Sequence, residues 1–179
     1  MKTTSLFIIP LLTAASVSAH GYVSQVLLNG KVFEGNTPGE EPKPSIIQQT
    51  THNDPIYGAD SADLTCGNSA HQPASLVADI NPGDTVQFTW SAGPKAGVHW
   101  LHDTGPIMTH LASCGSVPCN EFNSAEAKWF KIDQQGLKFH STDENPGSWV
   151  TQAGLCTFSK LFSQHLQVVS SSLLFSLSC

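Results

Sequence analysis

Short apolar segments that alternate with a period of two, separated by clusters of turn residues, are the feature that most constrains this fold. Residues 22–28 and 85–90 alternate in this way. Asn29-Gly30 follows the first segment as a hairpin turn signal, and residues 31–33 would begin the return strand. No stretch of ten residues or more carries a convincing helical stripe, so the chain is predicted to be built from strands.

The rest of the chain up to residue 150 continues this pattern. Further strands are expected at 75–80, 106–112 and 128–133, whereas 34–62 is expected to form a long surface loop or a pair of loops. Short strands separated by turns predict an all-β fold. The expected architecture is an immunoglobulin-like or fibronectin-III-like antiparallel β-sandwich with long loops.

The first nineteen residues have the features of a secretory signal peptide. Lys2 supplies a positive start, residues 6–12 form an apolar run, and Val17 and Ala19 are the small residues that signal peptidase requires. The apolar run is too short to span a membrane. We therefore expect a secreted, extracellular protein without a membrane anchor, in which cleavage after Ala19 makes His20 the first residue.

The charge of the remaining chain argues against some classes of partner. About 160 residues remain after cleavage, which is enough for one domain. They hold 7 lysines, no arginine and 14 acidic residues, so the net charge is 7 − 14 = −7. Nucleic acid is not an expected partner, because phosphate binding needs clustered cations. The low charged fraction suits a loop-rich β protein that acts on a neutral ligand. The protein is expected to be a monomer.

Five cysteines in a chain expected to be secreted predict disulfides, with one cysteine left over. Cys114 and Cys119 are close enough in sequence to close a small loop. Cys66, Cys156 and Cys179 remain, and the sequence alone does not pair them.

Eight histidines are many for a chain of this size. His110, on a predicted strand, is expected to be an ordinary sheet residue. His99 and His102 have an i, i+3 spacing and lie just before Gly105-Pro106, but this spacing alone is not diagnostic. Four further histidines are in polar or loop contexts and are expected at the surface: His52, His71, His140 and His165.

If His20 is the N-terminal residue, a metal-binding role for these histidines is favoured. A free α-amine has a pKa of about 7.7–8.0, low enough for a metal to displace its proton at neutral pH. The amine and the imidazole of His20 would then chelate one ion, and a second imidazole would complete a planar set of three nitrogens. Such a set favours Cu(II), whereas zinc prefers a tetrahedral set. The alternative is that a histidine beside the cleavage site is chance.

Other catalytic schemes find less support in the sequence. There is no G-x-S-x-G nucleophile elbow, P-loop, G-x-G-x-x-G, H-E-x-x-H or paired C-x-x-C motif. Several carboxylates could pair as in a glycosidase, but solvated acids on loops are the simpler interpretation: Asp103, Glu121, Asp133 and Glu144. A zinc or carboxylate hydrolase is therefore the weaker hypothesis.

Seven segments, taken together and in this order, resemble the fungal lytic polysaccharide monooxygenases of auxiliary-activity family nine, formerly classed as family-61 glycoside hydrolases. The resemblance covers residues 19–150 and its combination of motifs is specific. The segments are Ala19-His20-Gly21-Tyr22-Val23, Asn29-Gly30, Asp63-Leu64-Thr65-Cys66-Gly67, residues 80–90, residues 102–114, residues 128–132 and Gly147-Ser148-Trp149.

The resemblance implies particular site residues. His20 resembles the N-terminal histidine that holds a single copper ion in this family, and His102 resembles its partner, with His99 as the alternative. The commonest family spacing is H-x-G-P, whereas this chain has H-x-x-G-P. Cys114 and Cys119 resemble the short-range disulfide of the family, and Cys66 resembles the first cysteine of its long-range bridge.

The resemblance also implies a reaction. A copper-dependent oxidoreductase of this kind takes electrons from an external donor, uses O2 or hydrogen peroxide, and hydroxylates a polysaccharide at C1 and/or C4. Cellulose or a related β-glucan is the expected substrate. His20 and His102 are the expected catalytic residues, and Tyr22 is the candidate for stacking on a sugar ring.

The sequence departs from the family after Trp149. A catalytic domain is expected over 20–153, followed by a non-family tail over 154–179, so the sandwich is expected to be incomplete at its C-terminus. Residues 166–175 could equally form a final strand. Motifs for the axial tyrosine and for a supporting histidine and glutamine are not found there. The alternative function is therefore an inactive truncated copper- or glycan-binding module.

Overall fold

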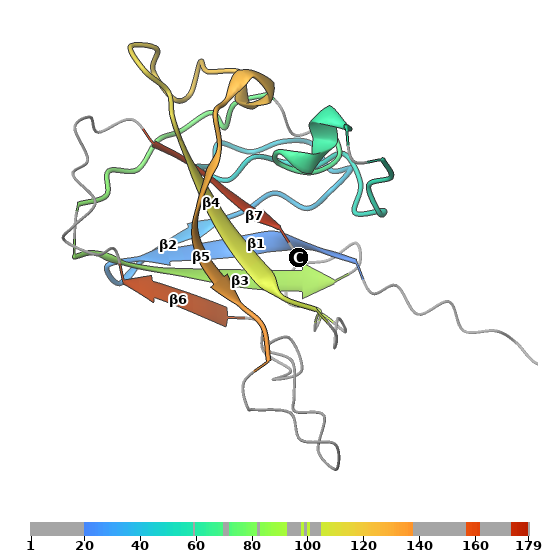
Figure 1. Cartoon of the computed structure of the whole chain (residues 1–179), viewed down its shortest axis with the longest axis horizontal. Helices are drawn as coiled ribbons and strands as arrows, with labels where there is room; N and C mark the ends of the chain where they lie inside the picture. The colour runs from blue at the N-terminus through green and yellow to red at the C-terminus, as the bar shows by residue number, and fades with distance from the viewer. Residues whose placement is uncertain are drawn as a thin grey trace, which may run out of the picture.

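Two antiparallel β-sheets make up the described part of the chain (Figure 1). The computed structural model describes residues 20–58, 60–69, 72–81, 83–92, 98, 100, 105–137, 157–161 and 173–178. The first sheet has the order β2-β1-β3-β6, with β1 over Gly21–Leu28, β2 over Lys31–Glu34, β3 over Thr85–Ala92 and β6 over Thr157–Leu161. The second has the order β5-β4-β7, with β4 over Ile107–Ser113, β5 over Phe130–Gln135 and β7 over Leu173–Ser178.

The turn between β1 and β2 forms as the sequence predicts. Asn29 and Gly30 have φ angles of 48° and 84°, and Leu28 pairs with Lys31 across the turn. A two-residue hairpin turn of this kind needs positive φ at both positions, which asparagine and glycine tolerate best. The sequence therefore specifies this hairpin locally.

The main hydrophobic core lies along β1 and β3. Val26 pairs with Phe88 and Leu28 with Val86, and all four side chains are buried. Ile132 of β5 packs against this cluster, so the second sheet closes over the first. The predicted antiparallel β-sandwich is thus confirmed.

A second cluster joins the end of β3 to the start of β4. It consists of Ala92, Trp100 and Ile107, which are 4%, 3% and 3% exposed. Trp90 packs against it, and the Trp90 and Trp100 rings stack with centroids 4.9 Å apart. This cluster anchors the chain immediately before and after residues 101–104.

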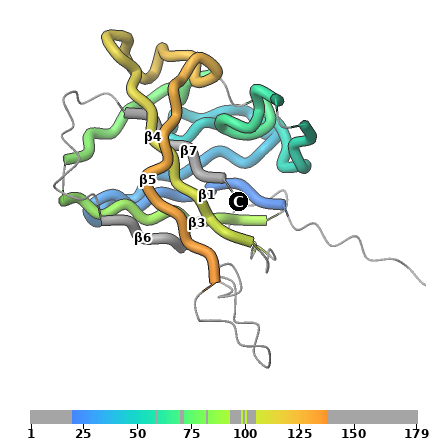
Figure 2. The backbone as a smooth tube through the Cα atoms, viewed as in Figure 1, coloured from blue at the N-terminus to red at the C-terminus, as the bar shows by residue number. Residues whose placement is uncertain are grey.

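The connection between β2 and β3 contains a short 3-10 helix, η1, over Ala62–Leu64, and follows an irregular path beside the first sheet (Figure 2). The strand predicted over residues 75–80 is wrong. Leu76 makes a backbone hydrogen bond to Ser45, but no strand ladder forms there. The apolar pattern of this segment has another cause, because Ala78 and Ile80 pack against the core cluster of β1 and β3.

Other predicted strands are confirmed with small shifts, and a second 3-10 helix, η2, spans Ser124–Glu126 between β4 and β5. β6 and β7 both lie within residues 154–179, where they pair with β3 and β4 respectively. The domain boundary at 153 stays a prediction. No helix in the described part of the chain is long and apolar enough to cross a membrane.

Candidate metal centre

His20 lies directly before β1 and is half-buried. The side-chain amide of Asn53 donates a hydrogen bond to the backbone carbonyl oxygen of His20, with an N–O distance of 3.3 Å. The loop that carries Asn53 therefore holds the backbone of His20 directly before β1.

Gly21 allows a close contact that anchors the start of β1. A Cβ atom at this position would lie 2.7 Å from Trp100 Cδ1 and 2.8 Å from the carbonyl oxygen of Ser91. Any larger residue would have to displace the buried indole ring or the backbone of β3. A glycine after His20 therefore lets Trp100 pack directly against the strand.

The expected partner histidines, His102 and His99, lie outside the described residues. Trp100, between them in sequence, packs beside Gly21, and Ala92 of β3 donates a backbone hydrogen bond to Val98 at 3.0 Å. Among the residues that the structure describes, no group of three or more His, Cys, Asp or Glu side chains could hold a metal ion. The described residues thus contribute His20 as the one predicted ligand.

Two other histidines occupy the environments expected of them. His52 is exposed and its Nδ1 lies 3.3 Å from Asp54 Oδ2, with both side chains largely in solvent. His110 is a half-exposed residue of β4 that pairs with Lys131. His71, His140 and His165 lie outside the described residues, as do Asp103 and Glu144.

The structure contradicts Tyr22 as a sugar-stacking residue. Its side chain is only 5% exposed, and its hydroxyl is buried without a hydrogen-bond partner among the described residues. A buried ring offers no face to a polysaccharide. Tyr57 is instead 84% exposed and follows the loop of His52 and Asn53. Sequence alone does not predict which tyrosine is exposed, because burial depends on packing between segments that are distant in the chain.

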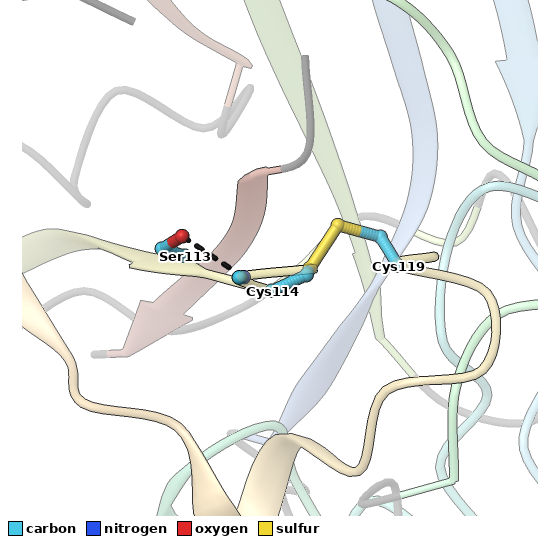
Figure 3. Close-up of a disulfide and its surroundings, with 4 residues drawn as sticks. Ser113, Cys114 and Cys119 are labelled. Atoms are coloured by element: carbon cyan, nitrogen blue, oxygen red, sulfur yellow. Dashed lines mark hydrogen bonds between the residues drawn. A yellow bond between two sulfur atoms is a disulfide. The ribbon is translucent and has the colours of Figure 1, made fainter. Parts of the chain in front are cut away.

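The disulfide expected between Cys114 and Cys119 is formed (Figure 3). Its sulfurs are 2.01 Å apart, and it ties the end of β4 to the loop that leads to η2. Cys66 is the free cysteine among the described residues. Burial raises the pKa of the Cys66 thiol, although hydrogen bonds with Ser124 and Thr65 act in the opposite direction. Cys156 and Cys179 lie outside the described residues.

The fold and the position of His20 place the chain among β-sandwich proteins similar to polysaccharide monooxygenases. A crystal structure of a cellulose-active polysaccharide monooxygenase from M. thermophila superposes with a TM-score of 0.62 and 28% identity. The match covers 80% of this chain and 62% of that one. A sequence model of Auxiliary Activity family 9, formerly GH61, matches residues 20–166. The chain therefore belongs to Auxiliary Activity family 9.

Two curated relatives extend this comparison. The AA9 family lytic polysaccharide monooxygenase D of Gloeophyllum trabeum is 43% identical over 156 residues, which are 85% of this chain and 43% of the relative. Monooxygenase B of Malbranchea cinnamomea is 35% identical over 158 residues, covering 83% of this chain and 59% of the relative. The chain thus spans about half the length of the curated relatives it matches.

Proposed function

We propose that this chain is a secreted, copper-dependent monooxygenase that cleaves cellulose or a related β-glucan oxidatively at C1 and/or C4. Membership of the family supports the reaction class, and the cellulose-active structural relative supports the substrate class. The observation that carries the proposal is the position of His20 at the start of β1, with its backbone held by Asn53 and Trp100 packed against the following glycine.

The donor set of His20 fits copper. Once the signal peptide is removed after Ala19, one residue supplies both an amine and an imidazole nitrogen, and nitrogen donors favour Cu(II) among the divalent metals of the first transition row. When bound, copper supplies the one-electron redox chemistry and the activation of O2 or hydrogen peroxide that an external donor initiates. The hydrogen bond from Asn53 restrains the backbone of His20 and so limits the orientations of the chelating pair.

His102 is the proposed second ligand. The contact between Trp100 and Gly21 supports this assignment, because it anchors the chain two residues before His102 next to the residue that follows His20. Gly105 has a φ angle of 125°, which permits a sharp change of direction before β4. His99 stays the alternative.

Tyr57 is the proposed sugar-stacking residue in place of Tyr22. It is the most exposed aromatic side chain of the described residues, and it follows the loop from which Asn53 contacts His20. Amphipathic aromatic rings suit contacts with sugars, which present apolar C–H faces between their hydroxyl groups. Because cellulose is uncharged, such a face needs no cationic residues.

A copper titration of the secreted chain tests the metal site. Mass spectrometry should first show an N-terminus at His20. Wild-type protein is expected to bind one copper ion and to give the electron paramagnetic resonance signal of a type 2 centre. His20→Ala should lose equimolar binding, because it removes the imidazole of the chelate. His52→Ala, which removes another histidine nearby, should bind like the wild type. Equal binding by all three proteins would overturn the site.

The reaction needs its own measurement. Incubation of the copper-loaded chain with cellulose and ascorbate is expected to release oxidised oligosaccharides, and the product ends would distinguish C1 from C4 oxidation. Tyr57→Ala should weaken binding to cellulose. Copper binding without any oxidised product from cellulose, xyloglucan or other β-glucans would contradict the enzymatic proposal and favour a binding module.

A further inference from the structure

The loop over residues 51–54, which carries Asn53, belongs to no helix or strand. Most of this loop is exposed, and Asn53 itself is half-buried. The side chain of Asn53 nevertheless donates a hydrogen bond to the carbonyl oxygen of His20 at 3.3 Å. An exposed loop without a ladder of backbone hydrogen bonds opens easily. Its position beside His20 therefore needs support from another part of the chain.

Asn68 supplies this support through its side chain and its backbone. The side-chain amide donates one hydrogen bond to the carbonyl oxygen of Asp54 at 2.7 Å and another to that of His52 at 3.3 Å. These two carbonyls belong to the residues on either side of Asn53. The backbone carbonyl of Asn68 accepts hydrogen bonds from the N–H and the hydroxyl of Thr51, at 3.0 and 3.3 Å. Within the described part of the chain, four hydrogen bonds thus join this one residue to the loop.

Asn68 is itself held firmly. Its residue is only 8% exposed. The neighbouring residues Gly67 and Ser69 donate backbone hydrogen bonds to the carbonyl oxygen and to the carboxylate of Asp63, both at 2.8 Å. Asp63 lies within η1. A buried amide that donates two hydrogen bonds resists displacement, because moving it would leave polar groups unpaired. The loop of Asn53 is therefore tied to η1 by way of Asn68.

We infer that Asn68 is a positioning residue for His20 and that it acts through Asn53. Its amide fixes the backbone on both sides of Asn53, which keeps the Asn53 side chain within reach of the His20 carbonyl. The consequence for copper affinity rests on the proposed function, in which His20 is a ligand. The link from Asn68 through Asn53 to the backbone of His20 does not depend on that function.

A double-mutant cycle, read by copper titration of the secreted chain, tests this inference. Asn53→Ala and Asn68→Ala should each weaken copper binding about 10-fold, as the loss of groups that orient a ligand does. The double variant should bind no more weakly than Asn53→Ala, because Asn68 then has nothing left to position, whereas independent effects would multiply to about 100-fold. The electron paramagnetic resonance signal of bound copper should change in the same way in both single variants. A double variant that binds more weakly than Asn53→Ala, or an unchanged affinity in Asn68→Ala, would overturn the inference.

Ser45→Ala is the matched control. Ser45 is also buried and lies in the same connection between β2 and β3, where its hydroxyl bonds the backbone of Glu34 and Ile47. This variant should bind copper like the wild type, and a loss equal to that of Asn68→Ala would overturn the inference. Asn68→Ser removes the same amide and keeps a polar group, so it carries the test if Asn68→Ala does not fold. Circular dichroism checks the folding of each variant.

Hydrogen exchange in the copper-free protein separates this inference from the proposed function. Nuclear magnetic resonance should show that the side-chain amide of Asn53 exchanges about 3- to 10-fold faster in the Asn68 variants, because its hydrogen bond to His20 opens more often. Ser45→Ala should leave this rate unchanged. A wild type that binds no copper would defeat the proposed metal site, and the exchange rates would still decide the inference. Equal rates in the wild type and the folded Asn68 variants would overturn it.

Discussion

At the scale of single residues, two residues that are not ligands position His20 in the candidate site. Gly21 lets a buried indole ring pack against the residue after His20, and Asn53 reaches the carbonyl of His20 from a distant loop. Neither residue would bind a metal. Both restrain the backbone of His20, and in the proposed copper site a restrained chelate would lose less conformational entropy when the ion binds.

Gly21→Ala should therefore weaken copper binding without removing a ligand. The new Cβ would lie 2.7 Å from the Trp100 ring and 2.8 Å from a backbone oxygen of β3, so the start of β1 must move. We expect copper affinity to fall about 10-fold, as for other groups that orient ligands. Gly115→Ala is the control, since its Cβ would meet nothing within 4 Å and its φ of 63° adds only local backbone strain away from the Asn53 loop. Calorimetric copper titration of both variants checks this; equal affinities would contradict it.

The ionisation of Asp84, in the turn directly before β3, makes the stability of the fold depend on pH. Its carboxylate accepts a hydrogen bond from the backbone N–H of Asn81 at 2.7 Å, and this bond, followed by the side chain of Asn29, lowers the pKa of Asp84. Because the pKa is lowered, ionised Asp84 stabilises the fold at neutral pH. This stabilisation is lost as the pH falls from 3.8, the ordinary pKa of an aspartate, through the lower pKa of folded Asp84.

Asp84→Asn removes this titration and keeps the shape of the side chain. The variant should be less stable than the wild type at pH 6, and the difference should shrink as the pH falls through the lowered pKa. Urea unfolding followed by tryptophan fluorescence over pH 2.5 to 6 measures it. A difference that stays constant over this range would show that Asp84 does not act through its charge.

At the scale of elements, the pairing of β1 with β3 carries the main core. Val86 is 3% exposed and packs with Val26, Leu28 and Phe88, whereas Val32 on β2 is 48% exposed. The two valines have the same side chain and differ in burial. Substituting each of them therefore compares directly how much burial contributes to the free energy of unfolding.

Val86→Ala should lower the free energy of unfolding by about 2 kcal/mol, because it removes two buried methyl groups and leaves a cavity. Val32→Ala should change it by less than about 0.5 kcal/mol, as expected for an exposed position. Urea unfolding curves of both variants give these values. A similar loss in the two would mean that the first sheet does not form the core described here.

At the scale of the whole molecule, the low charge of the chain limits the electrostatic contribution to substrate binding. The sequence carries 8 lysines, no arginine and 14 acidic residues, and cellulose is neutral. Long-range electrostatic attraction therefore contributes little to the proposed binding. Contacts from exposed groups such as Tyr57 would carry it instead.

Binding to cellulose should accordingly be almost insensitive to salt. Between 20 and 500 mM NaCl we expect the affinity to change by less than about twofold, because screening acts on charged pairs. Pull-down of the chain with microcrystalline cellulose at several salt concentrations measures this. A steep loss of binding with salt would indicate a charged ligand in place of a neutral glucan.

The sequence by itself determined the features that depend on neighbouring residues or on the order of motifs along the chain. The hairpin at Asn29-Gly30, the strands β3, β4 and β5 and the short loop closed by Cys114 and Cys119 all follow from local patterns. The order of motifs around His20 identified the family that the comparison confirms. The turn, the strands and the small disulfide loop are each encoded within a few residues, and the family is encoded in the order of short motifs. Neither depends on knowledge of packing.

Only the tertiary structure decided which side chains are buried and which segments meet. Residues 75–80 have a strand-like pattern because two of their apolar side chains pack on the core, although no ladder forms there. Tyr22 and Tyr57 differ in exposure because segments far apart in sequence cover the first and leave the second in solvent. The contacts of Asn53 with His20 and of Trp100 with Gly21 likewise join distant parts of the chain. Such contacts arise from close packing between layers, which alternation along one strand does not specify.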